Sequence, residues 1–324
     1  MARILTGIQS TGIPHLGNIL GAIQPAIEMS NNGNNESFLF IADMHSLTQI
    51  KDGKLLREHT YSVAATWLAF GLDTNKTVFY RQSDVPECAE LTWYLSCFFP
   101  FQRLKLAHSF KDKSDRLEDV NGGLFTYPML MAADILLYDA NFVPVGKDQV
   151  QHLEITRDVA SKVNNQYGKD LLVVPEVTVQ KDTQLILGTD GEKMSKSRDN
   201  FINVFESDKE LKNNINKKIV TDASALEDAK EPEGAAVFQL YKYVASADQV
   251  EELATKLRAG GYGWGHAKKD LLDAIIEKFG PAREKYNYYM SHRDELDRVL
   301  AEGAEKARVI AKATLKRVRK EMGY

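Results

Sequence analysis

One polar segment holds lysines and serines at a spacing that suits phosphate chemistry. Residues 191–200 read GEKMSKSRDN. The reactive side chains of this segment are Lys193, Ser195, Lys196 and Ser197. A solvated turn explains such a composition, and for this pattern alone it is the better interpretation. The alternative is a mobile clamp, because two ammonium groups can close on a polyphosphate and neutralise its charge. No side chain of the segment, Met194 included, is expected to anchor it in a core.

A second segment near the N-terminus has the composition of a nucleotide site. Residues 7–21 read GIQSTGIPHLGNILG and join a predicted strand to a predicted helix. Backbone N–H groups at a helix N-terminus favour an anion, and His15 and Asn18 can donate hydrogen bonds to phosphate or ribose oxygens. Three glycines allow close approach of the backbone to a ligand: Gly7, Gly12 and Gly17. The segment is neither G-x-G-x-x-G nor a P-loop, so a turn-rich junction is an equally good interpretation of it alone.

Alternating strands and helices are predicted to position both segments. Short apolar runs predict strands at 2–8, 37–43, 77–82, 142–146 and 171–176. Helical spacing covers 17–29 and a run that closes at Gly71, and a further helix is expected to begin near Asp148. This alternation predicts an α/β fold over residues 1–200, a Rossmann-like parallel sheet with helices on both faces.

The chain changes character beyond residue 200. Strand-like runs end there, and helical segments rich in Lys, Glu and Ala continue to Tyr324, which predicts a second, all-helical domain over 201–324. From Glu305 onward there are seven lysines and arginines against two glutamates. A solvated basic face is the favoured interpretation of this stretch, and RNA contact is the second. The aromatic residues that might stack on RNA bases, although core packing is favoured for each, are Tyr262, Trp264, Tyr286 and Tyr288.

The composition sets bounds on the function. The 324 residues are 44% hydrophobic and 27% charged, and the net charge of −4 gives the whole molecule no attraction for nucleic acid. Cys88 and Cys97 are the only cysteines, which argues against a disulfide framework and against zinc or iron–sulfur sites. No apolar run reaches the ~18 residues of a membrane span, and no signal peptide is recognisable. We therefore expect a cytoplasmic protein without membrane attachment.

The two segments together resemble class I aminoacyl-tRNA synthetases, whose first motif corresponds to HLGN (15–18) and whose second corresponds to KMSKS (193–197). GIQSTG (7–12), FIADMHSLT (40–48), LDRVLAEGAEKA (296–307) and residues 125–160 are similar to the tryptophanyl-tRNA synthetases. The resemblance implies a tryptophan–tRNA ligase that uses ATP with Mg²⁺, forms tryptophanyl-adenylate and charges tRNA(Trp). It also implies a homodimer with residues 85–140 at its interface, and a helical domain that reads the anticodon. Two alternatives stay open, a tyrosine-specific enzyme of the same class and a non-catalytic RNA-binding paralogue.

A substrate pocket can be argued from one predicted helix. Tyr127, Met131 and Asp134 fall at i, i+4 and i+7 and share a face. Asp134 lies in the apolar run LMAADILLY, where an unpaired carboxylate would be costly, so it needs a partner. An N–H group or an arginine elsewhere in the fold would serve. The resemblance implies instead that Asp134 accepts the indole N–H of tryptophan, with Tyr127 and Met131 against the ring. A tyrosine hydroxyl would satisfy the same carboxylate.

The resemblance implies the remaining site residues position by position. Further tryptophan-binding residues would be Gly7, His45 and Gln149. The catalytic residues would be Gln9, Lys113, Lys193 and Lys196, where Lys113 has a solvated charge run as its alternative. ATP would be bound by Gln9, Ser10, Thr11, His15, Gly17, Asn18, Gly146, Lys147, Asp148, Ile186, Lys193, Met194, Ser195, Lys196 and Ser197. The sequence departs from the family pattern at Ser10, where proline is usual, in the short segment 186–192, and in SRDNFINVF (197–205).

Overall fold

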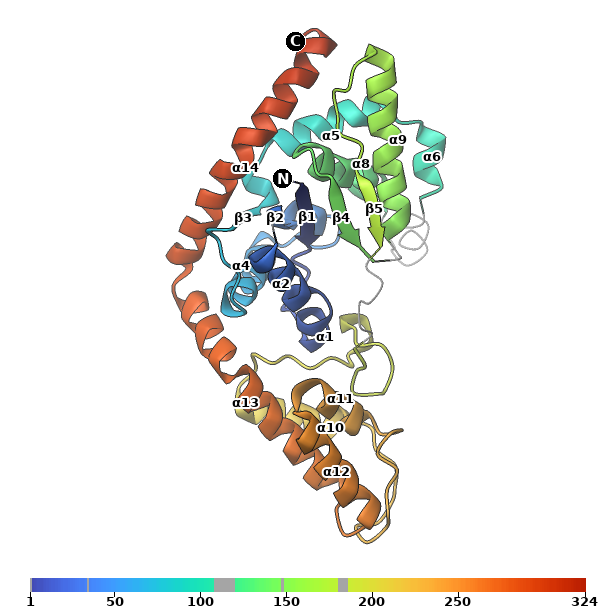
Figure 1. Ribbon diagram of the computed structural model, residues 1–324, viewed down its shortest axis with the longest axis vertical. Helices are drawn as coiled ribbons and strands as arrows, with labels where there is room; N and C mark the ends of the chain where they lie inside the picture. Colours follow the sequence, from blue (N-terminus) through green and yellow to red (C-terminus); the bar gives the residue numbers. More distant parts are fainter. Residues whose placement is uncertain (1, 34, 108–119, 147–148, 180–185) are drawn as a thin grey trace.

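The computed structural model describes residues 2–33, 35–107, 120–146, 149–179 and 186–324. Five parallel strands form one sheet in the order β3-β2-β1-β4-β5 (Figure 1). Their bounds are Arg3–Ile8 (β1), Glu36–Ile41 (β2), Thr77–Arg81 (β3), Phe142–Val145 (β4) and Glu176–Val179 (β5). The strand order reverses between β1 and β4, and in such sheets a ligand binds beyond the carboxyl ends of the strands at this switch point.

The alternation of side chains along the strands builds a core on each face of the sheet. Leu39 and Ile41 of β2 belong to a core that includes α4 (Gly53–Ala69), whereas Phe38 and Phe40 belong to the core on the opposite face. That second core includes α5 (Glu87–Phe98), α8 (Gly122–Leu136) and α9 (Val150–Tyr167). Helices therefore cover both faces, as the sequence predicts.

The helix after β1 contains a π-helical turn. Short α1 (Leu16–Asn18) continues through a π segment at Ile19–Ile23 into α2 (Gln24–Asn32), over the region predicted helical at 17–29. Single π turns inside helices occur frequently at functional sites. Here the π turn immediately follows the HLGN residues.

The strand predicted at 171–176 is wrong, because β5 begins only at Glu176. Asn164 of α9 explains the difference. Its side-chain amide donates to the carbonyl of Leu172 at 2.8 Å and accepts from the backbone N–H of Leu172 at 2.9 Å. Both backbone groups are thus taken by a side chain, and Pro175 has no N–H to give to a ladder. Leu171 and Leu172 are buried in the core without being part of the sheet.

The C-terminal third is helical in its described structure, as predicted. A lobe below the sheet contains α10 (Asp208–Lys218), α11 (Ala236–Val244), α12 (Ala247–Ala259) and the first half of α13 (Trp264–Ser291) (Figure 1). The second half of α13 leaves this lobe and packs on α4, and the last helix, α14 (Arg293–Met322), runs along the edge strand β3. A Cβ at Gly303 would lie 1.7 Å from the carbonyl oxygen of Phe79, so glycine permits this close contact.

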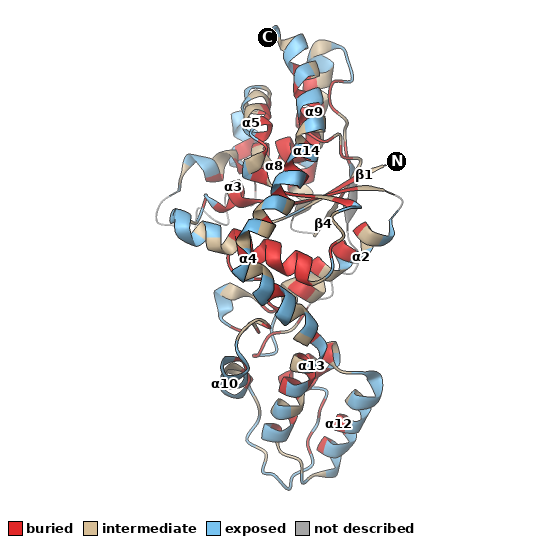
Figure 2. Cartoon of the chain, turned by 90° about the vertical axis from the view of Figure 1, so that its left-hand side faces the viewer, coloured by how far each residue is buried: buried red, intermediate tan, exposed pale blue. Residues whose placement is uncertain are grey.

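The helix α14 has a buried side and an exposed side (Figure 2). One side of the helix joins the core that α5 and α9 share, through Ala304, Ala307, Ala311, Leu315 and Val318. The other side is exposed. Short helices complete the described chain: α3 (Asp43–Ser46), 3₁₀ turns at Gln82–Asp84 and Lys196–Arg198, and α6 (Phe101–Lys105). No helix in the described ranges is long and apolar enough to cross a membrane.

Candidate active site

Two neighbouring cavities open near the carboxyl end of β1. The apolar pocket, of about 480 Å³, lies between β1, α8 and β4, and the loop cavity, of about 400 Å³, lies between the segment after β1 and the KMSKS segment. Ile8 and Gln9 line both. A molecule in one cavity would therefore approach a molecule in the other beside Gln9.

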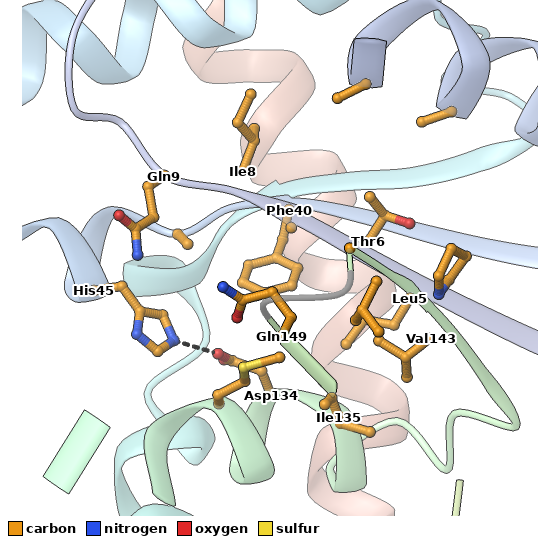
Figure 3. Close-up of a pocket in the computed structure, with 18 of the residues that line it drawn as sticks. Leu5, Thr6, Ile8, Gln9, Phe40, His45, Asp134, Ile135, Val143 and Gln149 are labelled. Carbon is orange, nitrogen blue, oxygen red and sulfur yellow. Dashed lines mark hydrogen bonds and ion pairs between the residues drawn. The ribbon is translucent and has the colours of Figure 1, made fainter. Parts of the chain in front are cut away.

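The apolar pocket gathers every tryptophan-binding residue expected from the sequence (Figure 3). Those residues are Gly7, His45, Tyr127, Met131, Asp134 and Gln149. Leu5, Phe40 and Val143 supply apolar walls. Gly7 is required by packing, because a Cβ there would lie 2.5 Å from the ring of Phe40. The volume is within the ~300–1,000 Å³ range of small-molecule pockets.

The carboxylate of Asp134 is buried and hydrogen-bonded at both oxygens. His45 Nε2 lies 2.8 Å from Oδ2, as the dashed line in Figure 3 marks. Gln82 Nε2 donates to Oδ1 at 2.8 Å and to Oδ2 at 3.0 Å, and Cys88 Sγ donates to Oδ1 at 3.0 Å. The partner that the sequence argument requires for Asp134 is therefore a set of three side chains within the protein, while the carboxylate also lines the pocket.

Tyr127 and Gln9 connect this carboxylate cluster to the loop cavity. The Gln9 amide nitrogen donates to the Tyr127 hydroxyl at 2.9 Å. The rings of Tyr127 and His45 meet edge to face, with centroids 4.4 Å apart. Because Gln9 borders both cavities, this contact places a fixed polar group at their junction.

His15 and Asn18 bind each other at the start of α1. The Asn18 backbone N–H donates to His15 Nδ1 at 3.3 Å, and the His15 backbone N–H donates to Asn18 Oδ1 at 3.2 Å. Burial lowers the pKa of His15 to about 4, and the nearby charge of Lys196 acts in the same direction. The imidazole is therefore neutral at pH 7 with its hydrogen on Nε2, from which it can donate to a ligand in the loop cavity.

Lys196 reaches across the loop cavity to the segment after β1. Gly12 has φ +130°, and a Cβ there would lie 2.9 Å from Lys196 Nζ, so glycine permits both the backbone turn and the approach of the lysine. Burial lowers the pKa of the Lys196 ammonium to about 8. Its ammonium group makes no ion pair with a carboxylate in the described ranges. A phosphate in the loop cavity would provide the missing counter-charge.

The KMSKS segment is anchored, contrary to the expectation from its composition. Met194 is only 4% exposed, and its backbone N–H donates to the Ile186 carbonyl at 2.9 Å. The Met194 sulfur accepts from the backbone N–H of Gly17 at 3.2 Å. The thioether is flexible enough to fill the gap between two loops, which charge and polarity counts do not reveal. The segment is thus tied to the segment after β1 by one apolar side chain between the two lysines.

The buried side chain of Asn200 holds the KMSKS segment at its C-terminal end through three hydrogen bonds. Its Oδ1 accepts from the Ser195 backbone N–H at 2.8 Å, and its Nδ2 donates to Asp190 Oδ1 at 2.7 Å and to the Lys193 carbonyl at 3.1 Å. A Cβ on Gly188 would lie 2.5 Å from the Asn200 backbone. These bonds hold residues 188–200 as one compact loop, which we call the Asn200 clasp.

The other expected ATP-binding residues are placed in different ways. Thr11, Asn18, Ser195 and Lys196 line the loop cavity, and Gly146 lines the apolar pocket. Ser10 is buried and bonds Ser46 Oγ through its backbone N–H at 3.0 Å and its hydroxyl at 3.2 Å. Lys193 and Ser197 are exposed and line neither cavity. Lys113, Lys147 and Asp148 lie outside the described residues.

Sequence reasoning missed four side chains that hold this site together: Ser46, Gln82, Cys88 and Asn200. Ser46, Gln82 and Cys88 act through partners distant in sequence, such as Asp134, 52 positions from Gln82. Asn200 binds residues within its own loop, but the composition of that loop gives no sign of this role. The only available signal was the lack of a charged partner for Asp134 in its own helix. In the described ranges no group of three His, Cys, Asp or Glu side chains is arranged to hold a metal ion.

Comparison with known proteins assigns the family. The model of tRNA synthetases class I (W and Y) matches residues 1–280. The tryptophan–tRNA ligase of Fusobacterium nucleatum is 45% identical over 323 residues, covering 100% of this chain and 98% of that protein. The chain belongs to the tryptophan–tRNA ligases of class I.

Solved structures of tryptophanyl-tRNA synthetases resemble this chain in both fold and amino-acid sequence. A tryptophanyl-tRNA synthetase from Campylobacter jejuni, complexed with ADP and tryptophan, matches with a TM-score of 0.95 and 43% identity, covering 99% of this chain and 100% of that chain. The enzyme from Mycoplasma pneumoniae matches with a TM-score of 0.78 and 28% identity, covering 100% of this chain and 98% of that chain.

Proposed function

We propose that this chain joins tryptophan to tRNA(Trp) in two steps at the junction of the apolar pocket and the loop cavity. In the first step a carboxylate oxygen of tryptophan attacks the α-phosphorus of ATP, the bond from that phosphorus to the bridging oxygen of pyrophosphate breaks, and tryptophanyl-adenylate forms. In the second a ribose hydroxyl at the 3′ end of tRNA attacks the tryptophanyl carbonyl, and AMP leaves. The observation that carries the proposal is the meeting of the two cavities at Gln9.

The protein's part in the first step is positioning and charge stabilisation. Negative charge grows on the departing pyrophosphate, and fixed donors aimed at that charge lower the barrier. Lys196 is proposed as the main donor, supported by its place at Gly12 and the absence of a carboxylate partner in the described chain. His15 Nε2 and the amide of Asn18 would hold the nucleotide, and Lys193 would join on closure of the loop.

Tryptophan would occupy the apolar pocket with its indole N–H on Asp134. Support comes from the buried carboxylate among apolar walls and from the tryptophan in the Campylobacter jejuni structure named above. Tyr127 and Met131 would border the ring, and Gln9 and Gln149 would face the amino-acid backbone. Asp148 and Lys147 are proposed for ATP and Lys113 for catalysis on the family pattern alone.

Magnesium is proposed to arrive with ATP. The described lining of the loop cavity contains hydroxyl, imidazole, amide and ammonium groups but no carboxylate. Such a donor set suits a Mg²⁺ ion held by phosphate oxygens and water, as is usual for this cation. When bound, the ion would neutralise phosphate charge. The residues of this chain would orient the phosphates through Lys196 and His15.

The helical lobe is proposed to bind the anticodon and α14 to contact tRNA phosphates. Exposed lysines on the outer side of α14 make no ion pair with any described residue: Lys306, Lys312, Lys316 and Lys320. Their free charges suit a polyanion. This basic row lies along the body of the sheet rather than on the lobe, so phosphate contacts would extend over the length of the molecule.

A homodimer is proposed through α5 and α6. Large apolar side chains point into solvent there, with Trp93 69% exposed and both Phe101 and Leu106 59% exposed. Clusters of exposed large apolar groups mark protein contacts. A second copy is the proposed occupant, in line with the dimer that the family resemblance implies. Light scattering of the purified protein would measure the mass, and a mass of one chain at micromolar concentration would contradict this part of the proposal.

The function is tested by ATP–pyrophosphate exchange with each of the twenty amino acids. Exchange is expected with tryptophan and at least about a hundredfold more slowly with phenylalanine, because a site built around a buried carboxylate rejects a ligand without a donor for it. The hydroxyl of tyrosine could satisfy this carboxylate, so the rate with tyrosine, expected to be lower than with tryptophan, decides between the two enzymes of the class. Exchange with tyrosine at an equal or higher rate would establish the tyrosine-specific alternative. Exchange with no amino acid would favour the non-catalytic paralogue.

A further inference from the structure

We propose that Gln82 and Cys88 are positioning residues that aim the Asp134 carboxylate and thereby set the preference for a ligand with an indole N–H. This inference rests on the proposed function, since it takes Asp134 as the acceptor of that N–H. Neither residue lines the apolar pocket. Cys88 would act on the substrate through Asp134, and Gln82 through Asp134 and the backbone of His45.

The contacts of Asp134 leave its carboxylate one orientation. An ionised carboxylate offers about four acceptor sites on its two oxygens. Gln82 and Cys88 hold Oδ1, and Gln82 and His45 hold Oδ2. Rotation of the carboxylate would break bonds on both oxygens at once. The Gln82 side-chain nitrogen donates one shared hydrogen bond to both oxygens. The Asp134 carboxylate, which lines the pocket, can therefore still accept a hydrogen bond from a ligand.

The direction of the Gln82 amide is fixed by a second contact. Its Oε1 accepts from the backbone N–H of His45 at 3.4 Å, so its nitrogen faces Asp134. Gln82 follows β3 directly and is 1% exposed, while Cys88 lies in the first turn of α5 and is 2% exposed. The turn after β3 and the start of α5 thus both contribute a donor to a single side chain of α8.

The thiol of Cys88 acts as a neutral donor. Burial raises its pKa well above the usual value, and the Asp134 carboxylate acts in the same direction, so the S–H is retained. A thiol is a weak hydrogen-bond donor. It can therefore orient the carboxylate without neutralising it, which a cationic partner would do. The charge of Asp134 stays available for the ligand.

The test compares tryptophan with its analogue in which sulfur replaces the indole N–H, β-(3-benzothienyl)alanine. The measured quantity is the ratio of kcat/KM for the two compounds in pyrophosphate exchange. Cys88→Ala is expected to lower this ratio about three- to tenfold, through a higher KM for tryptophan at nearly constant kcat, because one hydrogen bond is lost. Cys88→Ser keeps a donor and is expected to restore the ratio. Ser96→Ala, one hydroxyl removed from the same helix, is the matched control and should leave it unchanged.

The outcomes separate this inference from the proposed function. Absence of tryptophan-dependent exchange by the unaltered protein would overturn both. If the unaltered protein prefers tryptophan and Cys88→Ala keeps the same ratio, the function stands and the positioning role is wrong. Gln82→Met, which removes the amide at similar length, provides the second removal if Cys88→Ala does not fold, as thermal unfolding would reveal. An unchanged ratio in a folded Gln82→Met protein would overturn the role equally.

Discussion

In the proposed mechanism Lys196 is the main residue that stabilises the charge of the departing pyrophosphate. Its ammonium is half-buried, faces Gly12 across the loop cavity and has no carboxylate partner in the described chain. A lysine paired in a resting salt bridge would have to break that bond before meeting a phosphate. Lys196 starts unpaired, so its whole interaction with the departing pyrophosphate is available to the reaction.

Replacing Lys196 by alanine should therefore slow adenylate formation much more than it weakens tryptophan binding. The loss of one transition-state donor typically lowers the rate ~10²-fold or more. Rapid-quench measurement of adenylate formation, with a separate tryptophan titration, would check this. Lys269→Ala, which removes an exposed lysine in the helical lobe, is the control. A normal rate with only a raised KM for tryptophan would contradict the role of Lys196.

The pH dependence of ATP use should report the same lysine. Burial lowers the Lys196 pKa to about 8 in the ligand-free protein. As the pH rises through this value the ammonium loses its proton and its charge, so kcat/KM for ATP should fall above pH 8, whereas bound phosphates should move the corresponding fall in kcat to higher pH. Lys196→Arg keeps its charge at these pH values and should lack the fall. A fall at the same pH in the arginine variant would assign it to another group.

At the residue scale, contiguous motifs can be recognised in the sequence, but hydrogen-bond partners that meet only in the folded chain cannot. HLGN and KMSKS are contiguous, so their chemistry is readable before the fold is known. Gln82 and Cys88 donate hydrogen bonds to Asp134, but they come close to it only after β3, α5 and α8 have packed. Hydrogen bonding through a thiol has no sequence signature, and in the sequence Cys88 only argues against a disulfide framework and a metal site.

At the scale of elements, the loop that carries KMSKS depends on the Asn200 clasp. Asn200→Asp would set two carboxylates against each other at the 2.7 Å contact with Asp190, and should raise the KM for ATP about tenfold, with the KM for tryptophan unchanged. The double variant Asp190→Asn/Asn200→Asp restores a donor and an acceptor at this contact and should recover most of the loss. Asn213→Ala on exposed α10 is the control. Failure of the double variant to recover would assign the loss to the contact of residue 200 with the Lys193 carbonyl, where Asn200→Asp also replaces a donor by an acceptor. An unchanged KM for ATP in Asn200→Asp itself would contradict the role of the clasp.

The elements themselves were predictable where apolar periodicity agreed with the final role of the segment. Four of the five strands were located because β1 to β4 are short buried runs bounded by turns. Residues 171–176 have the same apolar character, yet their burial serves the core beneath α9, with Asn164 holding Leu172. Burial and strand pairing are separate properties, and apolar composition reports only burial. The packing of α14 along the sheet could likewise not be predicted from the sequence, because α14 contacts β3 and α5, which are far from it along the chain.

At the scale of the whole molecule, α13 and α14 join the helical lobe to the body of the sheet. Tyr286 stacks on Phe205 with centroids 3.8 Å apart and bonds Ser62 of α4 at 2.8 Å. Trp264 is also buried and donates to Asp222 at 2.8 Å. Core packing, the favoured interpretation of these two aromatic residues, is thus confirmed. For Tyr288 the prediction of core packing is wrong, because this side chain is 49% exposed, with its ring against that of His292, and it is the aromatic residue of the four that could stack on a base.

A tRNA bound along this length would touch the lobe and the active site at once. We expect a change of one base in the CCA anticodon to lower kcat/KM for aminoacylation by about ten- to a hundredfold, since contacts to a single unstacked base are typically worth ~1–3 kcal/mol. Tryptophan-dependent pyrophosphate exchange without tRNA should stay constant, because the apolar pocket and the loop cavity lie at the sheet. A transcript with one inverted base pair in the middle of the acceptor stem is the control for general folding of the RNA. Equal charging of the altered and unaltered anticodons would show that the lobe does not read the anticodon, and tRNA identity would then be recognised by the body of the sheet.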